Sequence, residues 1–94
     1  MDLNEIADRQ HEWLGRMGWT KATPLEDLAL IASEVGEAVN ECRGPQPTPE
    51  LGTELADIVL RVLGMARKMD IDIAAALKAK MQLNEQRGTR GRVI

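Results

Sequence analysis

Two acidic pairs are the feature of the sequence that most clearly suggests chemistry. Glu34 and Glu37 lie in the segment EVGE, and Glu54 and Asp57 lie in ELAD. Residues three apart share one face of an α-helix, and like charges at this spacing weaken the helix slightly. A single pair would more often be a solvated surface feature. The same pair recurs on two successive helical segments, each time beside an apolar stripe, and this repetition predicts a site that binds a cation.

The residue types narrow the choice of cation. Antiparallel packing of the two segments across the turn at residues 44–49 would gather the four carboxylates, which would not all stay ionised unaided in a partly buried cleft. Oxygen ligands favour Mg²⁺ or Mn²⁺ over zinc. Carboxylate di-iron bundles use Glu-x-x-His pairs, and the only histidine, His11, completes none. We therefore expect Mg²⁺, with Mn²⁺ as a substitute.

The last helical segment offers groups that suit phosphate. Lys80, Asn84 and Arg87 in KMQLNEQR have the spacing of residues on one helix face. Mg²⁺ held by carboxylates commonly completes its coordination with water and substrate phosphates. Lys and Arg neutralise phosphate charge, and Asn can orient a phosphate or sugar oxygen. On spacing alone, an ordinary exposed basic face is an equally good interpretation.

Four helices are expected to position these groups. No segment alternates polar and apolar residues for long, and β-branched residues do not cluster, whereas capping residues and helical apolar spacing recur. We expect helices that run from Asp2 to about Gly18, from Thr23 to about Arg43, from Thr48 to about Met69, and from Asp70 or Asp72 to near Gly88. The short connections predict an all-α, four-helix, bundle-like fold, with residues 1–94 as a single domain.

The apolar residues indicate more than one packing partner. On the third segment they spread over an arc of roughly 140° on a helical wheel, and a domain of this size buries only roughly 60–65% of its unfolded surface. Both observations favour a core that is completed by oligomerisation. Trp13 and Cys42 lie on apolar stripes and are expected in the core. Trp19 follows Gly18 and could instead stack on a nucleobase.

Together these segments resemble a known family. EVGE, ELAD after a short linker, and KMQLNEQR are similar to the motifs of the MazG-type all-α nucleoside triphosphate pyrophosphohydrolases. The resemblance spans nearly the whole chain, and it includes Trp19 after the first helix and MDIDIAAAL before the last. It implies Mg²⁺-dependent hydrolysis of a (deoxy)nucleoside triphosphate at the α-phosphorus, which yields a nucleoside monophosphate and pyrophosphate. It also implies a homo-oligomer, a dimer or a tetramer, with sites near the subunit interfaces.

The resemblance also implies roles for individual residues. The metal ligands would be the two acidic pairs, Glu34, Glu37, Glu54 and Asp57. The triphosphate contacts would be Lys80, Asn84 and Arg87. Glu34 or Glu37 would take the proton from the attacking water. Arg61 stands where relatives often carry an aromatic residue, and it could contact a phosphate or pair with an acid. The tail GTRGRVI lacks the proline that commonly follows the final arginine in relatives.

Other functions would share parts of this pattern. A dUTP-specific or a phosphoribosyl-ATP pyrophosphohydrolase would use the same metal residues, and a non-catalytic helical oligomer could carry the acids as a structural cation site. The formal net charge of -3 disfavours nucleic-acid binding. There is no signal peptide or apolar run of membrane length. We therefore expect a cytoplasmic protein that binds neither nucleic acid nor membrane.

Overall fold

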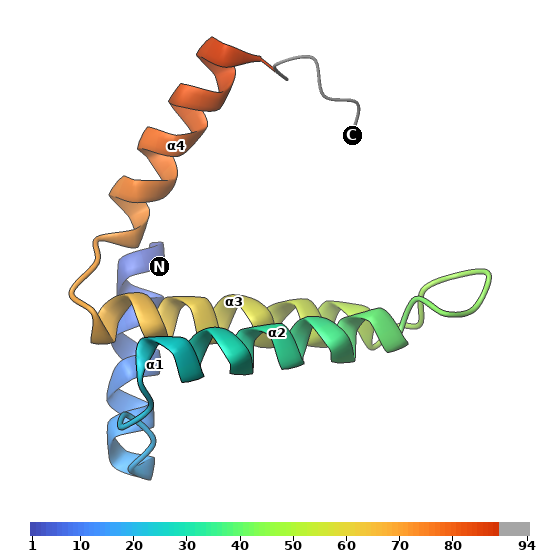
Figure 1. Cartoon of the computed structure of the whole chain (residues 1–94), viewed down its shortest axis with the longest axis horizontal. Helices are drawn as coiled ribbons and strands as arrows, with labels where there is room; N and C mark the ends of the chain where they lie inside the picture. Colours follow the sequence, from blue (N-terminus) through green and yellow to red (C-terminus); the bar gives the residue numbers. More distant parts are fainter. Residues whose placement is uncertain (89–94) are drawn as a thin grey trace.

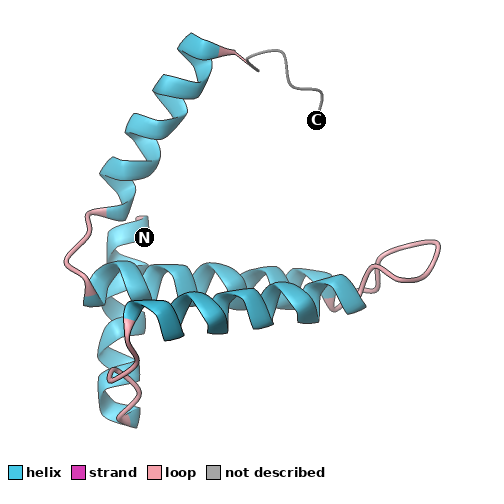
Figure 2. Ribbon diagram, viewed as in Figure 1, coloured by secondary structure: helices cyan, strands magenta, loops and turns pink. Residues whose placement is uncertain are grey.

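The computed structural model describes residues 1–88, and within that range it consists of α-helices and their connections. The helices are α1 (Leu3–Met17), α2 (Pro24–Asn40), α3 (Leu51–Lys68) and α4 (Ile73–Arg87) (Figure 1). No β-strand occurs in residues 1–88 (Figure 2), so the all-α prediction is confirmed. Among these residues, no helix combines the length and the apolar character that crossing a bilayer would require. The prediction about the tail at residues 89–94 lies outside the described residues.

Three helices begin where their capping residues predict. Asp2 caps α1 and Asp72 caps α4, each through a side chain that accepts a backbone hydrogen bond three residues further on. On α2, Thr23 and Glu26 form a reciprocal capping box. These side chains satisfy N–H groups that have no partner inside the helix. The starts of α1, α2 and α4 are therefore fixed locally by the sequence.

The start of α3 differs from the prediction. The sequence suggested Thr48 as its cap, but the helix begins at Leu51. The Thr48 hydroxyl instead donates to the Glu41 carboxylate, and the Thr48 N–H donates to the Glu41 carbonyl oxygen at 2.9 Å. Thr48 therefore closes the connection between α2 and α3 rather than opening the next helix.

The helices are arranged around α3. Helices α2 and α3 form an antiparallel pair, α1 crosses this pair at one end, and α4 stands away from it (Figure 1). Helix α3 contacts the other three helices, whereas α2 and α4 do not contact each other. Where α1 crosses α3, a Cβ added at Gly64 would lie 3.0 Å from Leu14 Cδ1. Glycine therefore allows the close approach that holds α1 against α3.

The single chain has a small core. Its buried apolar side chains within residues 1–88 are Ala7, Ala38, Leu63 and Ala66. The radius of gyration is 15.4 Å, whereas a compact domain of this length would have about 12 Å. Trp13 and Cys42 are exposed, so the prediction that they lie in the core was wrong. A helical wheel identifies an apolar side of a helix but not what covers that side.

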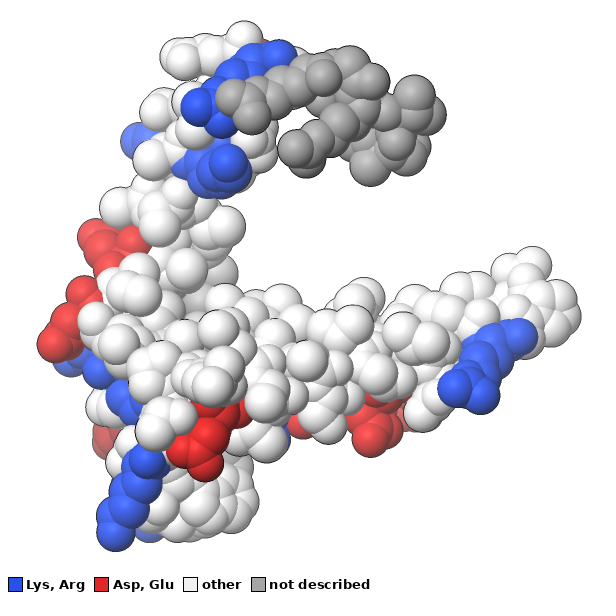
Figure 3. All heavy atoms as spheres, viewed as in Figure 1, with Lys and Arg blue, Asp and Glu red and all other residues white. Residues whose placement is uncertain are grey.

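The apolar stripes of α2 and α3 are largely uncovered. Five of their large aliphatic side chains are 45–54% exposed, namely Leu28, Val35, Val39, Leu55 and Val59. The face of the α2–α3 pair that is turned toward α4 carries almost no charge (Figure 3). We call these five residues the apolar face. Large exposed apolar side chains gathered on one face usually mark an interaction site.

Candidate metal centre

Three of the four predicted metal ligands lie together. Glu34 on α2 and Glu54 and Asp57 on α3 each offer a carboxylate oxygen, and these oxygens all lie within 4.8 Å of one another. The antiparallel packing of α2 and α3 brings them together across the helix pair. We call Glu34, Glu54 and Asp57 the acid cluster. Glu34 and Glu54 are half-buried, and Asp57 is exposed.

Glu37 lies beside the acid cluster rather than in it. It is one turn after Glu34 on α2, and its side chain is exposed. Burial is the largest cause of a raised pKa at Glu54, and the negative charges of Asp57, Glu37, Glu41 and Glu34 raise that pKa further. Five carboxylates therefore repel one another in this region. Such repulsion is the condition that a bound cation relieves.

The acid cluster fits a hard divalent ion. Its donors are all carboxylate oxygens, the type that Mg²⁺ and Mn²⁺ prefer. Ligand oxygens on opposite sides of an octahedral Mg²⁺ lie about 4.2 Å apart. Because the cluster oxygens are spread over no more than 4.8 Å, small side-chain rotations would place all three around one ion.

Charged side chains face one another at regular intervals along the α2–α3 pair. Asp27, Glu34 and Glu41 are spaced by seven residues on one helix and its end, and Glu54, Arg61 and Lys68 are spaced by seven on the other. Arg61 Nε donates to Glu34 Oε1 at 3.0 Å, and Lys68 forms an ion pair with Asp27. At the third position Glu41 faces Glu54, and the negative charge of Glu41 contributes to the raised pKa of Glu54. The acid cluster therefore lies where the facing pairs change from opposite charges to like charges.

Arg61 forms an ion pair with an acidic residue. The sequence allowed it either a phosphate or an acid as partner, and the structure shows an acid, Glu34. The Glu34 side chain is 20% exposed and the Arg61 side chain 40% exposed. Arg61 lies one turn after Asp57 on α3, so its guanidinium is at the edge of the acid cluster.

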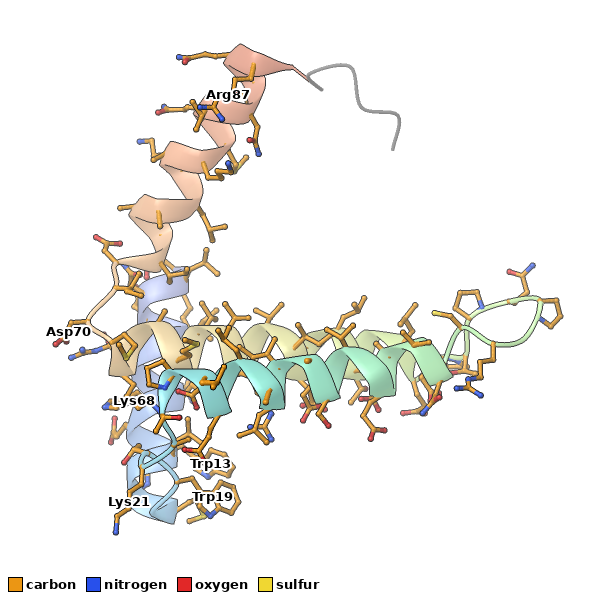
Figure 4. The ribbon with its side chains drawn as sticks, viewed as in Figure 1. Trp13, Trp19, Lys21, Lys68, Asp70 and Arg87 are labelled. Atoms are coloured by element: carbon orange, nitrogen blue, oxygen red, sulfur yellow. The ribbon has the colours of Figure 1, made fainter. Side chains whose placement is uncertain are left out.

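A cavity of about 700 Å³ connects the acid cluster to two aromatic side chains. Glu34, Asp57 and Arg61 line it from α2 and α3, and Trp13 and Trp19 line it from α1 and the connection after α1. The two indole rings pack edge to face, with centroids 5.4 Å apart and planes at 87° (Figure 4). The cavity thus presents acidic and arginine groups on one part of its wall and aromatic surface on another.

The cavity also contains an ion pair that the sequence interpretation missed. Asp27 and Lys68 form their ion pair in its wall, and Lys68 Nζ also donates to the Ala22 carbonyl oxygen at 2.7 Å. His11 Nδ1 is buried there and has no hydrogen-bond partner within residues 1–88. The seven-residue spacing from Asp27 to Glu34 and from Arg61 to Lys68 was the signal that could have revealed the ion pair.

The predicted phosphate ligands do not reach this cavity in a single chain. Lys80, Asn84 and Arg87 are all exposed on α4, and the described cavity wall includes no residue of α4. Arg87 lies at the far end of α4, away from α2 and α3 (Figure 4). Helix α4 also makes no contact with α2.

No family model, curated protein or solved structure matches the chain. The resemblance to MazG-type enzymes therefore stays a prediction carried by the segments EVGE, ELAD and KMQLNEQR. To those segments the structure adds the acid cluster, its arginine and the cavity between them and the tryptophans.

Proposed function

We propose that this protein hydrolyses (deoxy)nucleoside triphosphates at the α-phosphorus and releases pyrophosphate, with Mg²⁺ as its cofactor and Mn²⁺ as a substitute. The observation that best supports this proposal is a single cavity whose wall includes the acid-cluster residues Glu34 and Asp57, Arg61 and two tryptophans. Triphosphates bind through a divalent cation and basic groups, and nucleobases bind through aromatic faces. The volume of about 700 Å³ lies in the range of small-molecule sites.

The acidic residues divide into two roles in this proposal. Glu34, Glu54 and Asp57 would hold the ion, and Glu37 would stand beside them with an exposed carboxylate. When bound, the ion would polarise the phosphate and lower the pKa of a water ligand. Glu34 is already engaged by Arg61, whereas Glu37 lies outside the acid cluster. Glu37 is therefore the better of the two candidates to accept the proton of the attacking water.

The base would lie against the tryptophans. Trp19 is 61% exposed and Trp13 is 41% exposed, so both offer apolar surface without rearrangement of a core. Stacking of a base on an aromatic side chain contributes about 1–3 kcal/mol. The buried Nδ1 of His11 offers one hydrogen-bonding atom near the same wall.

We further propose that the protein acts as a homo-oligomer, a dimer or a tetramer. The apolar face would be covered by a second copy, because removing apolar side chains of this size from water lowers the free energy of the assembly. Lys80, Asn84 and Arg87 do not reach the cavity of their own chain. In an oligomer, these residues of one copy could contact the phosphates bound in the cavity of another copy.

The proposal is tested by pyrophosphate release from the eight common nucleoside and deoxynucleoside triphosphates, with Mg²⁺ or with chelator. We expect Mg²⁺-dependent release that falls by at least about 100-fold in Glu54→Gln and Glu37→Gln, a loss typical of removing one charged catalytic group. Glu12→Gln is the matched control, because Glu12 is an exposed carboxylate that pairs with Arg16 and does not line the cavity. Release that persists in chelator, or that survives Glu54→Gln, would contradict the proposal.

Adding dUTP and phosphoribosyl-ATP to this set of nucleotides separates the alternatives. Release from dUTP alone would indicate a dUTP-specific enzyme, and release only from phosphoribosyl-ATP would indicate that enzyme instead. The exposed apolar face also suits a non-catalytic interaction module. A folded oligomer that neither binds Mg²⁺ nor releases pyrophosphate would favour that module.

A further inference from the structure

Arg61 places a positive charge at the edge of the acid cluster. Its Nε donates to Glu34 Oε1 at 3.0 Å, and it lies one turn from Asp57 on the same helix. A divalent cation held by Glu34, Glu54 and Asp57 would therefore sit close to the guanidinium. The two cations would compete for Glu34 and would repel each other across a short distance.

We propose that Arg61 is the built-in counter-ion of the acid cluster and that it weakens the binding of a divalent cation that arrives alone. This inference rests on the metal site of the proposed function. Without a metal ion, Arg61 neutralises part of the charge on the acid cluster. When a cation arrives together with phosphate, the negative phosphate oxygens offset the repulsion between the cation and Arg61. The site then favours a cation–triphosphate complex over the free cation.

The guanidinium has the donors that this role requires. Arginine carries five N–H donors, and within residues 1–88 Arg61 bonds to the protein only through Nε. Its terminal Nη groups remain available in the cavity wall, where Arg61 is a lining residue. Arg61 can thus hold Glu34 and contact a phosphate oxygen with different edges of one planar group.

The neighbouring facing pair supplies an internal comparison. Lys68 and Asp27 also join α3 to α2 by an ion pair. Lys68 is seven residues after Arg61 on α3, and Asp27 is seven residues before Glu34 on α2. Neither residue belongs to the acid cluster. If Arg61 were only a bridge between helices, its removal would act like removal of Lys68: it would lower stability and leave metal affinity unchanged. If Arg61 opposes the cation, its removal will raise metal affinity.

The test is calorimetric titration of the full chain with Mn²⁺ alone, for wild type, Arg61→Gln, Arg61→Lys and Lys68→Gln. We expect Arg61→Gln to bind Mn²⁺ about tenfold more tightly than wild type, which corresponds to about 1.4 kcal/mol. Arg61→Lys keeps the charge and should stay within about threefold of wild type, a difference of less than 1 kcal/mol. Lys68→Gln should bind Mn²⁺ as wild type does. A gain in affinity cannot result from misfolding.

Thermal unfolding gives a second readout. In chelator, Arg61→Gln should melt below wild type, because the acid cluster loses its counter-ion. With saturating Mn²⁺, the variant should gain more in melting temperature than wild type gains, by mass action on the tighter site.

The outcomes separate this inference from the proposed function. If Arg61→Gln binds Mn²⁺ more weakly than wild type, Arg61 positions Glu34 for the metal and the inference is overturned. Equal affinity in wild type and Arg61→Gln overturns it as well, while the metal site stands. If none of the four proteins binds Mn²⁺, the metal site itself is wrong, and the proposed function fails together with this inference.

Discussion

The two sides of the α2–α3 pair differ in what covers them. On one side α1 crosses α3, the helix that carries the buried side chains Leu63 and Ala66, and α1 forms the cavity wall together with the charged pairs. The other side is the apolar face, which no other helix of the described chain covers, and α4 stands beyond it (Figure 3). The first side can be completed by one chain. The second side needs a partner before its apolar residues are removed from water.

The largest difference between the two sides should appear in core truncations. Leu63 is 2% exposed, so Leu63→Ala should lower the free energy of unfolding by about 3 kcal/mol through lost burial and a cavity. Leu55 is half exposed on the apolar face, so Leu55→Ala should cost much less in dilute solution. Chemical denaturation at low protein concentration measures both. Equal losses would show that the two sides are covered alike in the single chain.

A charge on the apolar face should dissociate the proposed oligomer. Val35→Glu places a carboxylate where the proposed second copy packs, and an unpaired charge there would be desolvated on assembly. We expect the mass measured by light scattering to fall to that of one chain, while Mn²⁺ affinity changes by less than about threefold, under 1 kcal/mol. Ser33→Glu, on the opposite side of α2, is the matched control. Unchanged mass in Val35→Glu would argue against a partner on this face.

The smallest predicted effect is in the pH dependence of stability. Burial, and then neighbouring acids, raise the pKa of Glu54 above its ordinary value of 4.5. Between these two values the folded state binds more protons than the unfolded state, so this contribution to stability falls as pH rises through that window. Glu54→Gln removes this contribution. In chelator, the melting temperature of Glu54→Gln relative to that of wild type should therefore increase as the pH rises through this window toward neutral.

Asp72 should show the opposite sign. Hydrogen bonds from the Ala75 N–H and then from the Asn4 side chain lower the pKa of Asp72 below its ordinary value of 3.8. This contribution is present above the ordinary value and is lost as pH falls through the lowered one. The difference between wild type and Asp72→Asn should therefore shrink with acid. Melting curves from neutral pH into the acid range, through the ordinary pKa values of both groups, measure the two effects. Parallel curves for Glu54→Gln and wild type would contradict the assignment at Glu54.

Local signals in the sequence predicted much of the fold. The caps at Asp2, Thr23 and Asp72 depend on contacts within one turn, and these are visible from spacing alone. The acidic pairs predicted the acid cluster because the antiparallel packing of successive helices follows from a short connection. Glu37 lies just outside the cluster, although it follows Glu34 by the same three-residue step that separates Glu54 from Asp57. The spacing within one helix therefore did not decide which of the four acids would meet.

Longer-range features could not be predicted in the same way. The position of α4 depends on the conformation of the connection after Lys68, where Asp70 has a positive φ of 55°. The exposure of Trp13 depends on where α1 crosses α3, a crossing that the approach at Gly64 permits. The ion pair of Asp27 and Lys68 requires the alignment of α2 on α3. Each of these depends on a contact between helices rather than on a pattern within one helix.

The alignment of α2 on α3 places the negative charges of Glu41 and Glu54 near each other, which raises the pKa of Glu54 and is locally unfavourable. If one helix slid by seven residues, Glu41 would face Arg61 and Glu34 would face Lys68, and the two like charges would separate. Such a slide needs about 10 Å of movement along the helix axis. The connection closed by Thr48 and Glu41 opposes it. The fold thus maintains a conflict that its own charges would remove, and a divalent cation at the acid cluster would resolve that conflict without moving the helices.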